Sequence, residues 1–278
     1  MRLGVDIGGT KIETVVLDAG GAERLRRRAM YRSRDYDAAL RLLADEIAAA
    51  ENDCERCSIG IGMPGFLDPR SGLVENAFNT PYNQKPLKSD LERMLKKEIR
   101  FANDANCFAL SEAVDGAARG ARVVFGAILG TGAGGGLVCG ARVIEGLHGT
   151  AGEWGHVPLP WMTPDEYPGP RCTCGRLGCI EQFVSGPAKN RERDQIGEDA
   201  AMARYVDRLA RAFAMMINIV DPDVIVVGGG MSKHDEIYTQ VPPLLGKYTY
   251  HPQPRTPIVR AAHGDASGVR GAAMLWPG

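Results

Sequence analysis

Short apolar runs, glycine turns and helical patterns alternate along the first part of the chain. Arg2–Val5 and Ile12–Leu17 are apolar, rich in β-branched residues and separated by a glycine turn, which predicts a hairpin. Apolar residues recur at helical spacing over Tyr36–Glu51, which predicts a helix. The elements expected next are a strand (Ser58–Gly62), a helix (Leu87–Lys97), a strand (Ile99–Ala102) and a helix (Ala105–Ala118) with its cap at or near Asp104.

The same order of elements begins again after Ala118. The expected elements are two strands (Val123–Leu129, Leu137–Cys139) around a glycine loop, a long helix (Met202–Val220), two further strands (Val224–Val227, Pro257–Ala261) and a terminal helix (Ser267–Leu275). A strand–glycine loop–strand hairpin thus opens each half, which predicts two α/β lobes that each offer one loop to a shared cleft. We expect the first lobe to cover 1–118 and to take back the terminal helix (265–278), and the second lobe to cover 119–264.

Composition and charge narrow the class of protein. The 278 residues are 44% hydrophobic and 24% charged, as in ordinary globular proteins. The 33 basic and 34 acidic residues leave a net charge of −1, which gives no electrostatic footprint for nucleic acid or an anionic membrane. The apolar runs are too short to cross a bilayer, and the N-terminus has no apolar signal core. A cytoplasmic enzyme or binding protein is expected.

The two glycine loops are typical of phosphate cradles. In the first, Gly8 and Gly9 let backbone amides approach a phosphate, Thr10 adds a hydroxyl, Lys11 a cation, and Asp6 a carboxylate for the water shell of Mg²⁺. The second cradle begins with Gly130, Thr131 and Gly132. Neither matches a P-loop or a dinucleotide fingerprint. One such turn alone is usually a plain hairpin, but two at the same position in both halves favour phosphate binding.

Three of the seven cysteines lie close together and predict a metal site. Cys172, Cys174 and Cys179 crowd within eight residues, and His156 lies sixteen residues before the first of them. Three thiolates and one imidazole make a closed tetrahedral Zn²⁺ shell without a position for water, so we expect a structural ion. The alternative is three buried thiols beside an unrelated histidine. The pair Cys54 and Cys57 has no second matching pair, and we expect both residues to be incidental.

A phosphoryl acceptor needs a base for its hydroxyl proton, and Asp104 is a candidate. It lies at an expected strand-to-helix junction, where a side chain can point into a cleft. The alternative is that Asp104 only caps the following helix, which is common for an aspartate before an apolar run. Local sequence does not decide between these two interpretations.

Several of these motifs resemble those of one family. Asp6–Lys11, Leu129–Gly136 and Val226–Met231 resemble the phosphate and adenosine motifs of the sugar kinase, hexokinase and actin superfamily. Within that superfamily, Glu153–His156 followed by Cys172–Glu181 resembles the signature of the ROK family, and the resemblance runs over nearly the whole chain. It implies an α/β, two-lobed, actin-like (ribonuclease-H-like) fold with a zinc-binding loop. It also implies an ATP-dependent hexose kinase that uses Mg²⁺, holds structural Zn²⁺ and forms a homodimer.

The resemblance also implies roles for single residues. Asp104 matches the general base of the family, and His156 would use one ring nitrogen for zinc and turn the other side of the ring to sugar. The implied sugar contacts are Gly65, Asn103, Asp104, Glu153, His156 and Glu181. The implied nucleotide contacts are Asp6, Gly8, Gly9, Thr10, Lys11, Gly130, Thr131, Gly132, Gly228, Gly229 and Gly230. The zinc ligands would be His156, Cys172, Cys174 and Cys179.

The preferred sugar is expected from two tracts. Gly149–Met162 and His263–Pro277 resemble bacterial fructokinases and mannokinases, which predicts fructose as the acceptor and mannose second. The alternatives are an N-acetylglucosamine or glucose kinase of the same family and, from another class, a sugar-sensing transcription repressor. The repressor is disfavoured because the phosphate hairpin begins at Leu3, which leaves no room for a helix-turn-helix domain. Pro187–Ala200 is shorter than in the family, which makes the adenine side of the pocket the less defined one.

Overall fold

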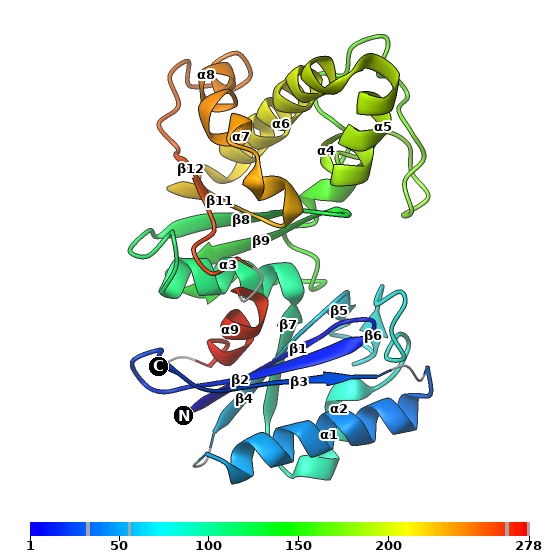
Figure 1. Cartoon of the computed structure of the whole chain (residues 1–278), viewed down its shortest axis with the longest axis vertical. Coiled ribbons are helices and arrows are strands. Elements are labelled where there is room, and N and C mark those ends of the chain that lie inside the picture. The colour runs from blue at the N-terminus through cyan, green and yellow to red at the C-terminus, as the bar shows by residue number, and fades with distance from the viewer. Residues whose placement is uncertain (32–33, 55–56, 265–266, 277–278) are drawn as a thin grey trace.

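The computed structural model describes residues 1–31, 34–54, 57–264 and 267–276, which form two stacked α/β lobes (Figure 1). The first lobe contains a five-stranded sheet in the order β3-β2-β1-β4-β7. Its strands are β1 (Arg2–Ile7), β2 (Lys11–Leu17), β3 (Glu23–Met30), β4 (Ser58–Met63) and β7 (Ile99–Asn103). β1 pairs antiparallel with β2 and parallel with β4, and β4 pairs parallel with β7. The glycine turn therefore lies at the same edge as the carboxyl ends of β4 and β7.

The second lobe repeats this plan, as the sequence predicts. Its sheet has the order β10-β9-β8-β11-β12. The strands are β8 (Val123–Leu129), β9 (Ala133–Cys139), β10 (Arg142–Val143), β11 (Val224–Gly228) and β12 (Ile258–Arg260). β8 again pairs antiparallel with the strand that follows its glycine loop and parallel with β11.

The helices form layers on and between the sheets (Figure 1). α1 (Tyr36–Asn52) and α2 (Leu87–Leu95) cover the outer face of the first sheet, and α6 (Glu198–Val220) covers the outer face of the second. α3 (Asp104–Val114) and α9 (Ser267–Ala273) lie between the two sheets. A Cβ on Gly60 of β4 would lie 1.9 Å from the carbonyl oxygen of Ala272, so only glycine lets α9 approach this closely.

The remaining elements are short, apart from α5. They are β5 (Phe66–Leu67), β6 (Val74–Glu75), the 3₁₀ helices η1 (Trp154–His156) and η2 (Gly230–Lys233), and the helices α4 (Glu181–Val184), α5 (Gly186–Ile196), α7 (Glu236–Thr239) and α8 (Pro242–Leu245). Among the residues described, no helix combines the length and the apolar character needed to cross a membrane.

The cap of α3 lies next to Asp104, within the predicted range. The N-cap is Asn103, and Asp104 already belongs to the first helical turn. Pro187–Ala200, which has no clear pattern in the sequence, lies in α5 and the start of α6. The edge strand β3 was not predicted. The terminal helix begins at Ser267, and the part of the expected range 265–278 that precedes it lies outside the described residues.

Candidate active site

Asn103 and Asp104 lie at the junction of β7 and α3. The Asn103 Oδ1 accepts a hydrogen bond from the backbone N–H of Ala105 at 2.8 Å, which caps α3. Its Nδ2 donates to the carbonyl of Gly65 at 2.9 Å. Gly65 has φ +73°, and a Cβ there would lie 2.1 Å from the carbonyl oxygen of Glu75. The sequence therefore needs glycine at 65, and Asn103 holds that backbone against α3.

Asp104 combines access to solvent with a position deep between the lobes. Its side chain stays exposed, yet the surrounding protein raises the pKa of its carboxyl to about 7. Desolvation is the main cause, and the negative charges of Asp6 and Glu153 add to it, whereas the backbone N–H of Ala105 opposes it. Burial also raises the pKa of Asp6 to about 6, against the effect of Lys11. A carboxylate with a pKa near 7 suits a general base at neutral pH.

Hydrogen bonds to its carbonyl oxygens fix the first glycine loop, and two of its residues are exposed to solvent. The N–H of Gly8 donates to the carbonyl of Lys11 at 2.9 Å. The hydroxyl of Tyr31 donates to the carbonyl of Gly8, and the N–H of Tyr31 donates to the carbonyl of Thr10 at 3.0 Å. Gly9 and Thr10 remain exposed. The sequence analysis missed Tyr31, whose only signal is its place directly after the unpredicted strand β3.

The other two glycine runs lie beside each other in the second lobe. The N–H of Gly130 donates to the carbonyl of Gly132 at 3.0 Å, which closes a tight loop with Thr131 exposed at its tip. Gly228 lies opposite Ile128 in the parallel pair of β8 and β11, so the run through Gly229 and Gly230 leaves the sheet next to this loop. The structure thus brings together the two runs expected to bind nucleotide in this lobe.

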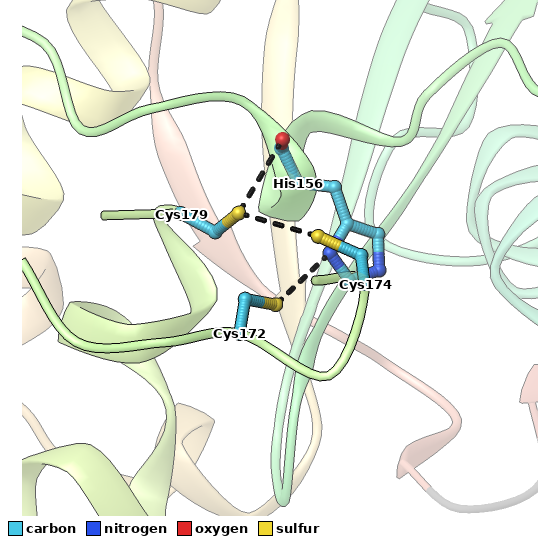
Figure 2. A group of neighbouring side chains, drawn as sticks. All are labelled: His156, Cys172, Cys174 and Cys179. Carbon is cyan, nitrogen blue, oxygen red and sulfur yellow. Dashed lines mark hydrogen bonds between the residues drawn. The ribbon is translucent and has the colours of Figure 1, made fainter. Parts of the chain in front are cut away.

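The histidine and the three cysteines expected to hold zinc converge (Figure 2). One ligand atom from each of His156, Cys172, Cys174 and Cys179 lies within 4.8 Å of all the others. The Nδ1 of His156 is 3.5 Å from the sulfur of Cys172, and the sulfurs of Cys174 and Cys179 are 3.6 Å apart. Zn–S bonds of 2.3 Å in a tetrahedron place two sulfurs ~3.7 Å apart. The donor set and its spacing therefore fit a closed zinc shell.

The segment 153–181, which contains the four residues of the His/Cys cluster and is called the zinc loop below, carries three of the expected sugar ligands. Glu153 precedes η1, His156 ends it, and Glu181 begins α4 two residues after Cys179. The Oε2 of Glu181 accepts from the N–H of Ala133 at 3.1 Å, so this side chain reaches the second glycine loop. Burial raises the pKa of Glu153, with the charge of His156 opposing and that of Glu181 adding to the shift. Because Glu153 also acts on Asp104, the carboxylates of both lobes face one cleft.

Two further residues, Trp154 and Asn79, lie near the glycine loops. Trp154 is buried, stacks on Phe213 with ring centroids 5.5 Å apart, and donates from Nε1 to the carbonyl of Gly134 at 2.8 Å. Its role is packing. The carbonyl of Asn79 lies 3.1 Å from the point where a Cβ on Gly9 would stand, so Asn79 lies against the first glycine loop.

An open cavity of about 850 Å³ reaches Asn103 from the other side of α3. It runs between β7 and β10, with Phe66, Leu110 and Arg142 among its lining residues. Asp104 and the glycine loops are not part of that lining. The site is therefore defined by its converging carboxylates and glycine loops, and not by the size of this cavity.

Comparison with known proteins identifies the family. The profile of the ROK family matches residues 2–278. The chain belongs to the ROK family. An N-acetyl-D-glucosamine kinase of Pectobacterium atrosepticum is 39% identical to this ROK chain over 300 residues, which cover 99% of the chain and 98% of that kinase.

Solved structures agree with this result. A ROK hexokinase from Thermus thermophilus superposes with a TM-score of 0.86 at 29% identity and covers 99% of this chain and 97% of its own. A ROK glucokinase from Streptomyces griseus, in complex with glucose and AMPPNP, has a TM-score of 0.78 at 26% identity, with 99% and 98% covered. The expected two-lobed, actin-like fold with a His/Cys cluster suited to zinc is thus confirmed.

The expectation of a fructokinase is not supported. The relative at 39% identity carries the activity that the sequence analysis gave as the alternative, an N-acetylglucosamine kinase.

Proposed function

We propose that this ROK protein is an ATP-dependent N-acetyl-D-glucosamine kinase. The observation that carries the proposal is the 39% identity to such a kinase over 99% of this chain. The site adds support, because it has an aspartate with a raised pKa, three glycine runs, and acidic side chains next to the His/Cys cluster. Each of these parts has a use in phosphoryl transfer to a sugar hydroxyl.

In this proposal Asp104 accepts the proton of the attacking hydroxyl. With its pKa raised to about 7, the carboxyl is ionised in much of the protein at neutral pH and basic enough to take a proton. Asn103 orients the acceptor beside it, since its own position is fixed by Gly65 and Ala105. Glu153, His156 and Glu181 bind the sugar from the opposite lobe.

The glycine runs of both lobes bind the nucleotide. Exposed backbone N–H groups at Gly9, Thr10 and Thr131 can approach phosphate oxygens, and Gly229 and Gly230 lead toward the adenosine. Mg²⁺ bound with ATP would neutralise charge on the phosphates, with Asp6 in reach of its water shell. Closure of the lobes excludes water, so that the sugar and not solvent accepts the phosphoryl group.

A coupled assay of ADP release tests this function. The acceptors are N-acetylglucosamine, glucose, fructose and mannose, each measured at saturating Mg-ATP. We expect kcat/KM for N-acetylglucosamine to exceed that of the other three by at least tenfold. A higher kcat/KM for glucose would favour a glucokinase instead, and a higher value for fructose would restore the first expectation. ADP release without any sugar dependence would contradict the kinase assignment.

A further inference from the structure

Three buried charged side chains lie behind the zinc loop. Glu166, Arg208 and Arg211 are 8%, 5% and 3% exposed. The Oε1 of Glu166 accepts from the Nε of Arg208 at 2.7 Å and from the Nη2 of Arg211 at 2.8 Å. Its Oε2 accepts from the Nη1 of Arg211 at 2.7 Å and from the N–H of Thr163 at 3.0 Å. Glu166 thus bridges two guanidinium groups of α6. Arg208 also pairs with Glu192 at 2.7 Å, and Arg211 with Asp207 at 3.0 Å.

The two arginines extend this cluster to both sides of the zinc loop. Arg211 donates from Nη1 to the carbonyl of Trp161 at 2.8 Å, in the segment that follows His156. The guanidinium of Arg208 lies over the ring of Phe183, 5.1 Å from its centroid. Phe183 belongs to α4, two residues after Glu181. The cluster therefore contacts the chain just beyond two of the proposed sugar ligands and fixes both segments to one helix.

The two segments are also joined to each other. The N–H of Leu159 donates to the carbonyl of Gly178 at 2.8 Å, and the N–H of Ile180 donates to the carbonyl of Val157 at 2.9 Å. These bonds fix the segments relative to one another. Apolar residues of both segments, among them Leu159 and Ile180, also pack in the core of the second lobe. The Glu166 cluster adds directed contacts between these segments and α6.

We infer that Glu166 is a positioning residue for sugar binding, which holds Glu181 and His156 at the cleft through Arg208 and Arg211. It does not touch the sugar. Ion pairs of this kind are seldom needed for stability alone, because apolar side chains of similar volume often fill such a core equally well. What the charged groups add is direction, since the guanidinium N–H groups of Arg211 donate to fixed acceptors, the carboxylate of Glu166 and the carbonyl of Trp161. The inference rests on the proposed function, in that the zinc loop binds the acceptor.

The first test is Glu166→Gln, which keeps the shape but removes the negative charge that both buried guanidinium groups share, leaving Arg208 paired with Glu192 and Arg211 with Asp207. We expect KM for the sugar to rise about tenfold, while kcat and KM for ATP stay within about twofold, because fewer molecules hold the loop in its binding position. Asp165→Asn is the matched control. Asp165 is exposed and accepts from the hydroxyl of Thr163, so its sugar KM should not change.

A second variant separates positioning from stability. In Glu166→Met/Arg208→Met/Arg211→Met the three central charged groups become apolar, while Glu192 and Asp207, 20% and 39% exposed, keep access to water. This should restore most of the folding lost when only one partner is changed. We expect this protein to unfold at the wild-type temperature and to keep its zinc by elemental analysis, yet to show the raised sugar KM. A folded, zinc-loaded triple variant with the wild-type sugar KM would overturn the inference, even if Glu166→Gln did not fold.

The acceptor in both tests is whichever hexose the wild-type protein phosphorylates best. The result therefore does not depend on the preference for N-acetylglucosamine. If the wild type phosphorylates none of them, the proposed function fails, and the sugar Kd from calorimetry replaces KM in the same comparison of variants.

Discussion

Asn103 joins the start of α3 to the backbone of Gly65, with its Oδ1 on the helix and its Nδ2 donating to that carbonyl at 2.9 Å. One side chain thus satisfies a free helix N–H and fixes a loop with a left-handed glycine. The residue next in sequence is the proposed base. The position of Asp104 is therefore set by two elements, β7 and the loop after β4.

Substitutions of Asn103 should distinguish the effects of its two hydrogen bonds, one to the N–H of Ala105 and one to the carbonyl of Gly65. Asn103→Ala removes the cap and should lower the free energy of unfolding by about 1 kcal/mol. Asn103→Ser keeps a capping oxygen but cannot donate to Gly65, so its stability should stay near wild type. We expect both variants to raise the sugar KM, because both release the loop at 65. Urea unfolding and steady-state kinetics on the same preparations check this, and a wild-type KM in Asn103→Ser would show that the bond to Gly65 has no part in sugar binding.

Asp104→Asn should abolish base catalysis and spare binding. General-base assistance is typically about 10²- to 10⁴-fold, so kcat should fall by a factor in that range. The fold should survive, because Asn103 and not Asp104 is the N-cap residue of α3. Steady-state kcat and sugar affinity by calorimetry make the measurement. Near-normal turnover would mean that another group takes the proton.

The raised pKa of Asp104 predicts an acid limb in the pH profile. With the pKa at about 7, kcat/KM should fall as pH drops through neutrality, because protonation removes the base. Assays from pH 5 to 9 in a buffer of constant ionic strength check this. A flat profile between pH 6 and 8 would contradict the assignment.

The same pKa predicts the pH dependence of stability. The folded protein binds this proton more tightly than the unfolded chain, whose aspartate keeps the usual pKa of 3.8. The ionised carboxyl therefore costs stability above pH 7, and the cost disappears as pH falls toward 4. Asp104→Asn should unfold at higher urea than wild type at pH 8, with a smaller difference at pH 5. A difference that grows at acid pH would be the opposite of this expectation.

The His/Cys cluster should bind one zinc ion per chain. A structural zinc site typically contributes on the order of 10 kcal/mol of apparent binding free energy, so Cys174→Ala should lose the metal and loosen the segment that presents His156 and Glu181. Elemental analysis and sugar KM are the readouts. Cys139→Ala is the control, because this cysteine lies in β9 outside the cluster and should leave the zinc content unchanged. Full activity in a zinc-free protein would show that the metal site is not needed for sugar binding.

Local patterns predicted much of the fold. Both glycine hairpins, α1 and the long helix before Asp221 follow from periodicity and turn residues, and the cysteine spacing predicted the cluster in Figure 2. β3 was missed because its sequence from Glu23 to Met30 is mostly charged. Two of its arginines, Arg26 and Arg28, pair with Glu13 of β2, which Arg28 contacts at 2.9 Å. An isolated stretch of sequence does not contain that partner.

Contacts between distant residues were beyond the reach of local patterns. Glu166 and Arg208 are 42 positions apart, and neither has a neighbour in sequence that marks it as buried. The acceptor sugar escaped prediction for a related reason. Carboxylates and amides that bind hydroxyls common to many hexoses define a sugar kinase, but the discriminating contacts depend on loop geometry.

The place of α9 between the sheets has a consequence for synthesis on the ribosome. This helix is translated long after β1 and β4, yet it packs against both strands (Figure 1). Domains usually fold as units while the chain is still emerging. Here the first sheet leaves the exit tunnel well before the helix that covers its inner face, so the apolar residues of that face stay uncovered until Ser267–Ala273 has been made.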